Sequence, residues 1–181
     1  MKLLTDIKCW FGQWKLKHFD LESNRKRAVF NLKTANRITI LFNATEPENI
    51  QKVNEFVKTI SIGKKIVSAM GFVNEQNISF EHMSTLHFDY FSNKDLNWYG
   101  KPQGMVIDNF IKEDYDILID LTLTKSYPLT YMAVASPAKF KVGRCRADIS
   151  VFDLSIDITK DQSLDALIKE ITHYLNRIEP I

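Results

Sequence analysis

Six polar residues stand at the ends of two apolar, strand-like runs and have the chemistry of a ligand site. They are Asn43, Thr45, Asp120, Thr122, Thr124 and Ser126. Amide, hydroxyl and carboxylate groups at the carboxyl ends of parallel strands are typical of small-molecule sites in α/β proteins. Asp120 is suited to contact a ligand or a metal, but an acidic residue near a strand end also caps neighbouring loops and helices. Both interpretations of Asp120 stay open, and we predict no metal site.

Common catalytic and nucleotide-binding patterns are missing from the sequence. The loop 43–47 contains no glycine, whereas phosphate-binding loops use glycines to bring backbone N–H groups close to the ligand. Asp116 and Asp120 share one face of a strand, but they are roughly 13 Å apart, which is too far for a retaining pair of carboxylates. The four histidines lack the spacing of a metalloprotease or nucleophile motif. We therefore predict no catalytic residues and no cofactor.

A second group of candidate site residues is cationic. Residues 1–40 hold nine Lys or Arg against three acids, a local charge of +6, whereas the whole chain carries +2. This asymmetry favours contact with a polyanion. The candidate anion-binding or nucleic-acid-binding residues are Lys15, Lys17, Arg25, Lys26, Arg27, Lys139, Lys141, Arg144 and Arg146. For Lys139 and Lys141 the alternative is the protection of an edge strand against pairing.

The first part of the chain predicts a basic amphipathic helix. Between Leu3 and Phe19 apolar residues recur at helical spacing, with lysines at many of the other positions. The apolar face, with Trp10 and Trp14, has three potential surfaces to cover: the protein's own sheet, a groove on a partner protein, or a membrane. The three adjacent cations at 25–27 are not all expected to find partners inside the protein. We expect residues 1–36 to form a basic helical arm and residues 37–181 to form a single α/β domain.

The remainder of the chain alternates strand-like and helix-like segments. We expect strands at 37–43, 65–72, 85–91, 115–123, 138–143 and 149–158, with helices at 45–62, 105–112, 129–135 and 164–178. Thr45 and Glu48 have the spacing of a capping box, and Ser163 is the expected cap of the last helix. The alternation predicts a three-layer α/β sandwich with a mostly parallel sheet, of the Rossmann-like or flavodoxin-like kind.

Length and composition are those of a globular protein with one sizeable core. The chain has 181 residues, of which 45% are hydrophobic and 25% are charged. No apolar run approaches the roughly 20 residues of a membrane span, and the N-terminus lacks the pattern of a secretory signal. Cys9 and Cys145 do not form a disulfide framework or a metal-binding pair. We expect a cytoplasmic protein without a transmembrane segment.

Three segments carry a resemblance to known families: 115–121, 127–129 and 136–143. Through them the chain resembles a family of small uncharacterised proteins from Bacteroidota, over most of its length. This resemblance implies a cytoplasmic protein of that phylum and brings no assigned activity or site residues. The central strand-helix-strand unit is also similar to one in heptosyltransferase-like glycosyltransferases. That second likeness implies a shared architecture, which does not license a function.

Two functions are compatible with the sequence. The leading hypothesis is a non-enzymatic binding protein that contacts an anionic partner, RNA or the ribosome, through its basic arm. The N-terminal helix is also suited to bind a protein partner. The alternative is a small-molecule-binding domain or enzyme with a pocket at the carboxyl ends of the strands. A deep pocket joining Asp120 to Asn43 and Thr45 would favour the alternative, and a flat basic face would favour the leading hypothesis.

Overall fold

The computed structural model describes residues 25–146 and 151–180, in which six strands form one all-parallel sheet of order β3-β2-β1-β4-β5-β6. The strands are β1 (Arg37–Asn43), β2 (Ile66–Val73), β3 (Phe88–Ser92), β4 (Ile117–Asp120), β5 (Phe140–Arg144) and β6 (Leu154–Ile156). The α-helices are α2 (Pro47–Ile60), α3 (Met105–Lys112), α4 (Tyr127–Ala135) and α5 (Leu164–Arg177). Two short 3₁₀ turns are η1 (Phe80–His82) and η2 (Asn93–Asp95). The predicted α/β sandwich with a parallel sheet is confirmed, and the strand order is the doubly wound Rossmann order.

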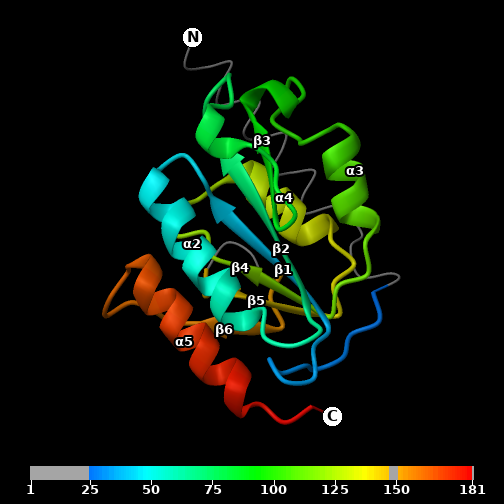
Figure 1. The fold of residues 1–181 in the computed structure, drawn as a ribbon, viewed down its shortest axis with the longest axis vertical. Helices are drawn as coiled ribbons and strands as arrows, with labels where there is room; N and C mark the ends of the chain where they lie inside the picture. The colour runs from blue at the N-terminus through cyan, green and yellow to red at the C-terminus, as the bar shows by residue number, and fades with distance from the viewer. Residues whose placement is uncertain (1–24, 147–150, 181) are drawn as a thin grey trace.

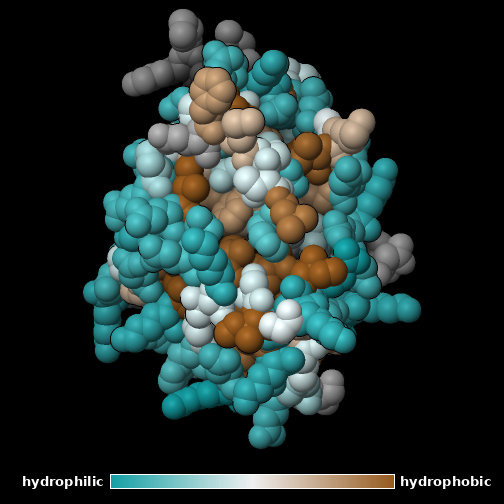
Figure 2. Space-filling model, in the orientation of Figure 1, coloured by the Kyte–Doolittle hydropathy of each residue, from teal (hydrophilic) through white to brown (hydrophobic). Residues whose placement is uncertain are grey.

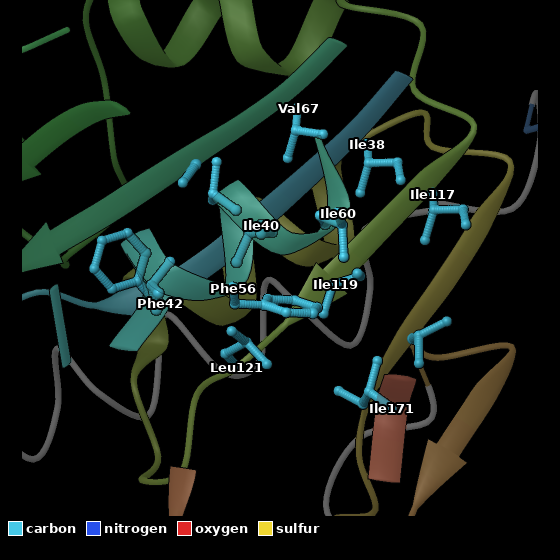
Figure 3. Close-up of a cluster of buried hydrophobic side chains, with 14 of the residues drawn as sticks. Ile38, Ile40, Phe42, Phe56, Ile60, Val67, Ile117, Ile119, Leu121 and Ile171 are labelled. Carbon is cyan, nitrogen blue, oxygen red and sulfur yellow. The ribbon is translucent and has the colours of Figure 1, made fainter. Parts of the chain in front are cut away.

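The helices cover both faces of the sheet (Figure 1). Because side chains alternate along a strand, Ile40 of β1 faces the core beneath α2 and α5, whereas the next residue, Leu41, faces the core beneath α3 and α4. Figure 3 shows the first of these cores, where Phe56 of α2 and Ile171 of α5 approach Ile119 of β4. The strand order reverses between β1 and β4, and α/β proteins bind ligands at the carboxyl ends of the strands at such a reversal.

Local sequence signals account for several of these elements. Strand β1 has the predicted bounds, and Ser163 caps α5 as predicted, since its hydroxyl oxygen accepts a hydrogen bond from the Ala166 N–H at 3.1 Å. The predicted capping box at Thr45 is wrong. Helix α2 begins at Pro47, and the Thr45 hydroxyl oxygen accepts instead from the Asn74 N–H at 2.9 Å. The loop after β2 thus competes successfully for the capping group.

Four strands, β3, β4, β5 and β6, are shorter than predicted, and the difference is largest for β4 and β6. Strand β4 covers Ile117–Asp120 of the expected 115–123, and β6 covers Leu154–Ile156 of the expected 149–158.

Strand β5 pairs with β4 on one side and with β6 on the other. Protection of a sheet edge is therefore the wrong explanation for the lysines of β5.

Residues 25–36, the described part of the expected basic arm, pack on the α/β body. The Ala28 N–H donates to the Lys139 carbonyl oxygen at 3.3 Å, and the Leu32 N–H donates to the Leu175 carbonyl oxygen at 3.1 Å. Leu32 and Ala35 are buried in the core beneath α5. The expected helix at 3–19, with Lys15 and Lys17, lies outside the described residues.

The connection from β2 to β3 contains η1 but no α-helix, so it leaves apolar side chains in solvent. Phe80 is 91% exposed and Leu86 is 92% exposed. Figure 2 shows apolar residues gathered in the middle of the face between α2 and α3, framed by hydrophilic side chains. None of the helices in the described ranges combines the length and the apolar character that a bilayer crossing requires.

Candidate functional site at the carboxyl end of β4

A buried ion pair occupies the carboxyl end of β4. Asp120 is the last residue of β4, and its side chain is only 1% exposed. Arg146 lies just beyond β5, and its Nη2 is 3.1 Å from Asp120 Oδ2, while the Thr122 N–H donates to Asp120 Oδ1 at 2.9 Å. Burial raises the pKa of the Asp120 carboxyl, although Arg146 and Thr122 oppose this effect. The pair is therefore held in an environment that penalises any unbalanced charge.

Phe152 positions the guanidinium of this pair. Gly143 is the residue of β5 opposite Asp120, and a Cβ there would lie 2.6 Å from the Phe152 ring. The absence of a side chain at Gly143 lets the ring approach the backbone of β5. The Arg146 guanidinium carbon lies 5.8 Å from the centroid of the Phe152 ring, within range of a cation–π contact.

Three polar atoms, two on the connection from β4 to α4 and one on Arg146, are buried and make no hydrogen bond with the described residues. They are Thr122 Oγ1, Ser126 Oγ and Arg146 Nε. The Thr122 hydroxyl is close enough to the Asp120 carboxylate to favour its ionised form, but it is not aligned for a hydrogen bond with it. Buried polar atoms are almost always paired, so a group of three unpaired atoms at one strand end calls for an additional partner.

The N-terminus of α4 adds backbone donors at the same end of β4. Ser126 is the N-cap residue, but its side chain makes no capping hydrogen bond, and the first turn carries no acidic residue. The first N–H groups of a helix have no partner inside the helix and favour a negative charge. Helix α2 differs, because it carries Glu48 in its first turn. Of these two helix ends, that of α4 is better suited to an anion.

The other predicted pocket residues do not join this site. Asn43 Oδ1 accepts from the Thr45 N–H at 2.9 Å, and Thr45 is itself bonded to the Asn74 N–H, so both side chains shape the loop between β1 and α2. Thr124 is exposed. The structure thus brings together Asp120 and Thr122, adds Arg146 from the predicted cationic set, and places Ser126 at the N-cap of α4, the helix that follows β4.

Of the three adjacent cations at 25–27, only Arg25 is held inside the protein. Arg25 makes two hydrogen bonds to the Asp153 carboxylate, at 2.6 and 2.7 Å, and a third to the Ala138 carbonyl oxygen at 3.1 Å. The Arg25 side chain is 7% exposed. Arg27 Nε lies 3.7 Å from Asp153 Oδ1, with its side chain 58% exposed, and Lys26 is exposed. Burial of Arg25 was unforeseen because Asp153 is remote in the sequence.

The predicted cations in and next to β5 also bond to groups of the protein itself. Lys139 pairs with Asp114 and Asp116, and Arg144 donates to the Leu123 carbonyl oxygen at 2.7 Å. Lys141 is buried, and its Nζ donates to the Val134 carbonyl oxygen at 3.0 Å. Burial, with the nearby Arg25, lowers the pKa of Lys141 to about 7. Internal partners thus hold Lys139, Lys141, Arg144 and Arg146, so these side chains do not form one exposed basic surface.

Sequence reasoning missed a second polar feature on the face covered by α3. A cavity of about 200 Å³ lies between α3 and the first halves of β1, β2 and β3. Its polar lining consists of Thr39, Ser68, Asp89, Asn109, Glu113 and Tyr115. The available signal was the placement of Thr39 and Ser68 on the same face of two neighbouring strands. In the described ranges, no three His, Cys, Asp or Glu side chains are grouped so as to hold a metal ion.

Comparison with known proteins places the chain in a family. No curated protein and no solved structure matches it. One family model, described as a family of unknown function, matches residues 8–178. This match covers nearly the whole chain, including all the strands and helices of the sheet. The chain therefore belongs to DUF6913, a family of unknown function.

Proposed function

We propose that this protein is a ligand-binding domain that holds a small anionic molecule at the carboxyl end of β4. The observation that carries the proposal is three buried, unpaired polar atoms on Thr122, Ser126 and Arg146, at the strand end that holds one buried ion pair and at the start of the helix that follows it. This is the small-molecule function predicted as the alternative from the sequence, with Arg146 in place of Asn43, Thr45 and Thr124.

The available groups favour an anion over a cation. Arg146 Nε can only donate a hydrogen bond, and the hydroxyls of Thr122 and Ser126 can also donate. The first N–H groups of α4 add further donors and a partial positive charge. Asp120 is the carboxylate of the site, and its charge is balanced by Arg146 at 3.1 Å. A phosphate or carboxylate group would therefore meet donors without facing an uncompensated negative charge.

The position in the sheet supports the same proposal. Strands β1 and β4 are neighbours at the point where the strand order reverses. In doubly wound sheets, the loops after two such strands diverge to opposite faces and leave room for a ligand. The loop after β1 contains no glycine and leads to a helix with Glu48 in its first turn, so the loop after β4 is the better anion site.

The test is a titration with phosphate, sulfate and acetate, followed by thermal unfolding. A ligand at about a hundred times its Kd stabilises the folded state by roughly 2.7 kcal/mol. At roughly 2–4 °C per kcal/mol for a chain of this size, Tm should rise by at least about 5 °C. Thr122→Val and Ser126→Ala remove one hydroxyl each, keep the ion pair, and should abolish most of the rise.

Thr124→Val is the matched control, because Thr124 lies in the same loop but is exposed. It should respond to the anion as the wild type does. Sodium chloride at equal ionic strength controls for a general salt effect. An equal response of wild type and all variants, or no response to any anion, would rule out this site.

RNA or ribosome binding through the basic N-terminal segment remains a second proposal. It is supported by the +6 charge of residues 1–40 and by the exposure of Lys26 next to Arg27, which is 58% exposed. The test replaces Lys26 and Arg27 by Ala and keeps Arg25, whose loss would break a buried ion pair. RNA affinity should fall in the variant and should weaken several-fold between about 50 and 200 mM salt in the wild type.

A cytoplasmic location and an origin in Bacteroidota remain proposals that rest on composition and resemblance.

A further inference from the structure

The cavity beneath α3 has a floor of hydroxyl groups where a hydrophobic core would be expected. Thr39 of β1 lies opposite Ser68 of β2 and is 0% exposed, and the Ser68 hydroxyl donates to Thr39 Oγ1 at 3.2 Å. The Tyr115 hydroxyl lies beside them, 3.5 Å from Glu113 Oε2. On the same face of the sheet, Leu41 follows Thr39 along β1, and Leu118 of β4 lies opposite Thr39. The Ser68–Thr39 and Tyr115–Glu113 hydrogen bonds offset part of the cost of burying these hydroxyls, and the lone pairs that remain make the floor suited to a polar ligand.

The rim of the cavity is acidic. Asp89 of β3 is exposed, and its carboxylate makes no ion pair or hydrogen bond within residues 25–146 and 151–180. Glu113 forms an ion pair with Arg37. The lining includes no cationic side chain, so Asp89 is left as an unbalanced negative charge at the entrance. A carboxylate or phosphate ligand would be repelled there, whereas a cation would be attracted.

The size of the cavity limits the ligand to a few heavy atoms. At roughly 30 Å³ for each water molecule in the liquid, 200 Å³ is the volume of about six or seven waters. Drug-sized ligands need about 300 Å³ or more. The apolar part of the lining, which includes Met70 and Phe110, accommodates a short hydrocarbon segment.

We propose that this cavity binds a small organic ammonium ion that carries a hydroxyl group, of the amino-alcohol class. The ammonium group pairs with Asp89 at the rim, and the hydroxyl group joins the hydrogen bonds of Thr39, Ser68 and Tyr115 on the floor. Burial raises the pKa of Tyr115, so its hydroxyl stays protonated, and because it donates to Glu113 its oxygen is the atom that can accept from the ligand. This site is separate from the anion site, because it lies at the amino halves of the strands.

The test is a titration with ethanolamine hydrochloride, monitored by backbone amide NMR. Saturable shifts are expected at the N–H groups of β2 and β3 that border the cavity. Ethylamine lacks the hydroxyl and ethylene glycol lacks the charge, so each should bind more weakly than ethanolamine. Asp89→Asn should weaken ethanolamine binding about tenfold, the effect of losing one charge-assisted hydrogen bond.

Asp108→Asn is the matched control, since Asp108 is an exposed acid of α3 outside the cavity lining. It should bind ethanolamine as the wild type does, and so should Thr122→Val, which alters only the proposed anion site. Asp89 is exposed, so its substitution should leave the fold intact. The inference is overturned if no saturable shift occurs, or if Asp89→Asn binds ethanolamine as tightly as Asp108→Asn does.

Discussion

Arg25 and Asp153 are 128 residues apart in the chain, yet the Arg25 guanidinium binds both oxygens of the Asp153 carboxylate. Burial disfavours ionisation of Asp153. Hydrogen bonds from Arg25 and from the Lys141 N–H outweigh that effect and lower the pKa of the carboxyl. This contact fixes the segment before β1 against the connection between β5 and β6.

Breaking this ion pair should destabilise the protein strongly. Replacing Arg25 by Met leaves the Asp153 carboxylate, 16% exposed, without its main partner, which should cost about 3–5 kcal/mol of unfolding free energy. The measurement is equilibrium denaturation in urea. Arg27→Met is the control, and it should cost at most about 1 kcal/mol, because Arg27 is 58% exposed. Equal losses in the two variants would show that burial of Arg25 does not determine the effect.

Lys141 should make stability depend on pH above neutrality. Its pKa is about 7 in the folded protein, against 10.5 as the ordinary value. The unfolded chain therefore binds more protons between these values, so stability is greatest above about 10.5 and falls as the pH falls towards 7. From about pH 9.5 down to about pH 7 this group alone should remove roughly 3 kcal/mol.

Lys141→Met should remove that pH dependence, because it deletes the titrating group and keeps an unbranched side chain. The control is Lys58→Met on the exposed side of α2, which should retain the wild-type slope. Unfolding free energies from urea denaturation at the two pH values provide the comparison. A wild type with the same stability at both would show that Lys141 keeps an ordinary pKa.

Gly143→Ala should disturb the ion pair at the end of β4. The added Cβ would lie 2.6 Å from the Phe152 ring, so the ring must shift from Gly143, and this disturbs its contact with Arg146. Overpacking of this kind costs about 1–3 kcal/mol. A double-mutant cycle with Phe152→Leu provides the measurement. Gly143→Ala should cost less unfolding free energy in the Phe152→Leu background than in the wild type, because leucine has no ring for the added Cβ to meet. Simple additivity of the two single effects would argue against direct contact.

Helix α5 should depend on its buried apolar stripe. Leu167 and Ile171 are both 0% exposed in the core, so replacing either by Ala should cost about 2–5 kcal/mol. Lys169→Ala, on the exposed side of the same helix, should change stability by less than about 0.5 kcal/mol. Chemical denaturation of the three variants gives the comparison, and a loss within error at Leu167 would place the stripe outside the core.

Elements with a strong local pattern could be predicted from the sequence, and contacts between distant residues could not. Strand β1 and helix α5 follow directly from apolar periodicity and, for α5, from the cap at Ser163. Asp120 and Arg146 were both identified as candidate site residues, but they were assigned to different sites. Their pairing depends on β4 and β5 being neighbours, which is a property of the strand order and is not encoded in either segment.

The same limit explains the missed cavity and the misassigned cap. Thr39, Ser68 and Asp89 lie on three different strands, and each alone is an ordinary polar residue in a strand. Thr45 has the local spacing of a helix cap, but its hydroxyl bonds to Asn74 because β2 ends beside β1. In both cases a tertiary neighbour decides the role of the side chain.

The docking of residues 25–36 has a consequence for the order in which the chain folds during its synthesis. Arg25 needs Asp153, and the Leu32 N–H needs the carbonyl of Leu175, so these two contacts cannot form until almost the whole chain has been made. The pairing of β1 with β4 also joins segments far apart in sequence, and such topologies fold slowly. The first described residues of the chain are therefore among the last to reach their native positions.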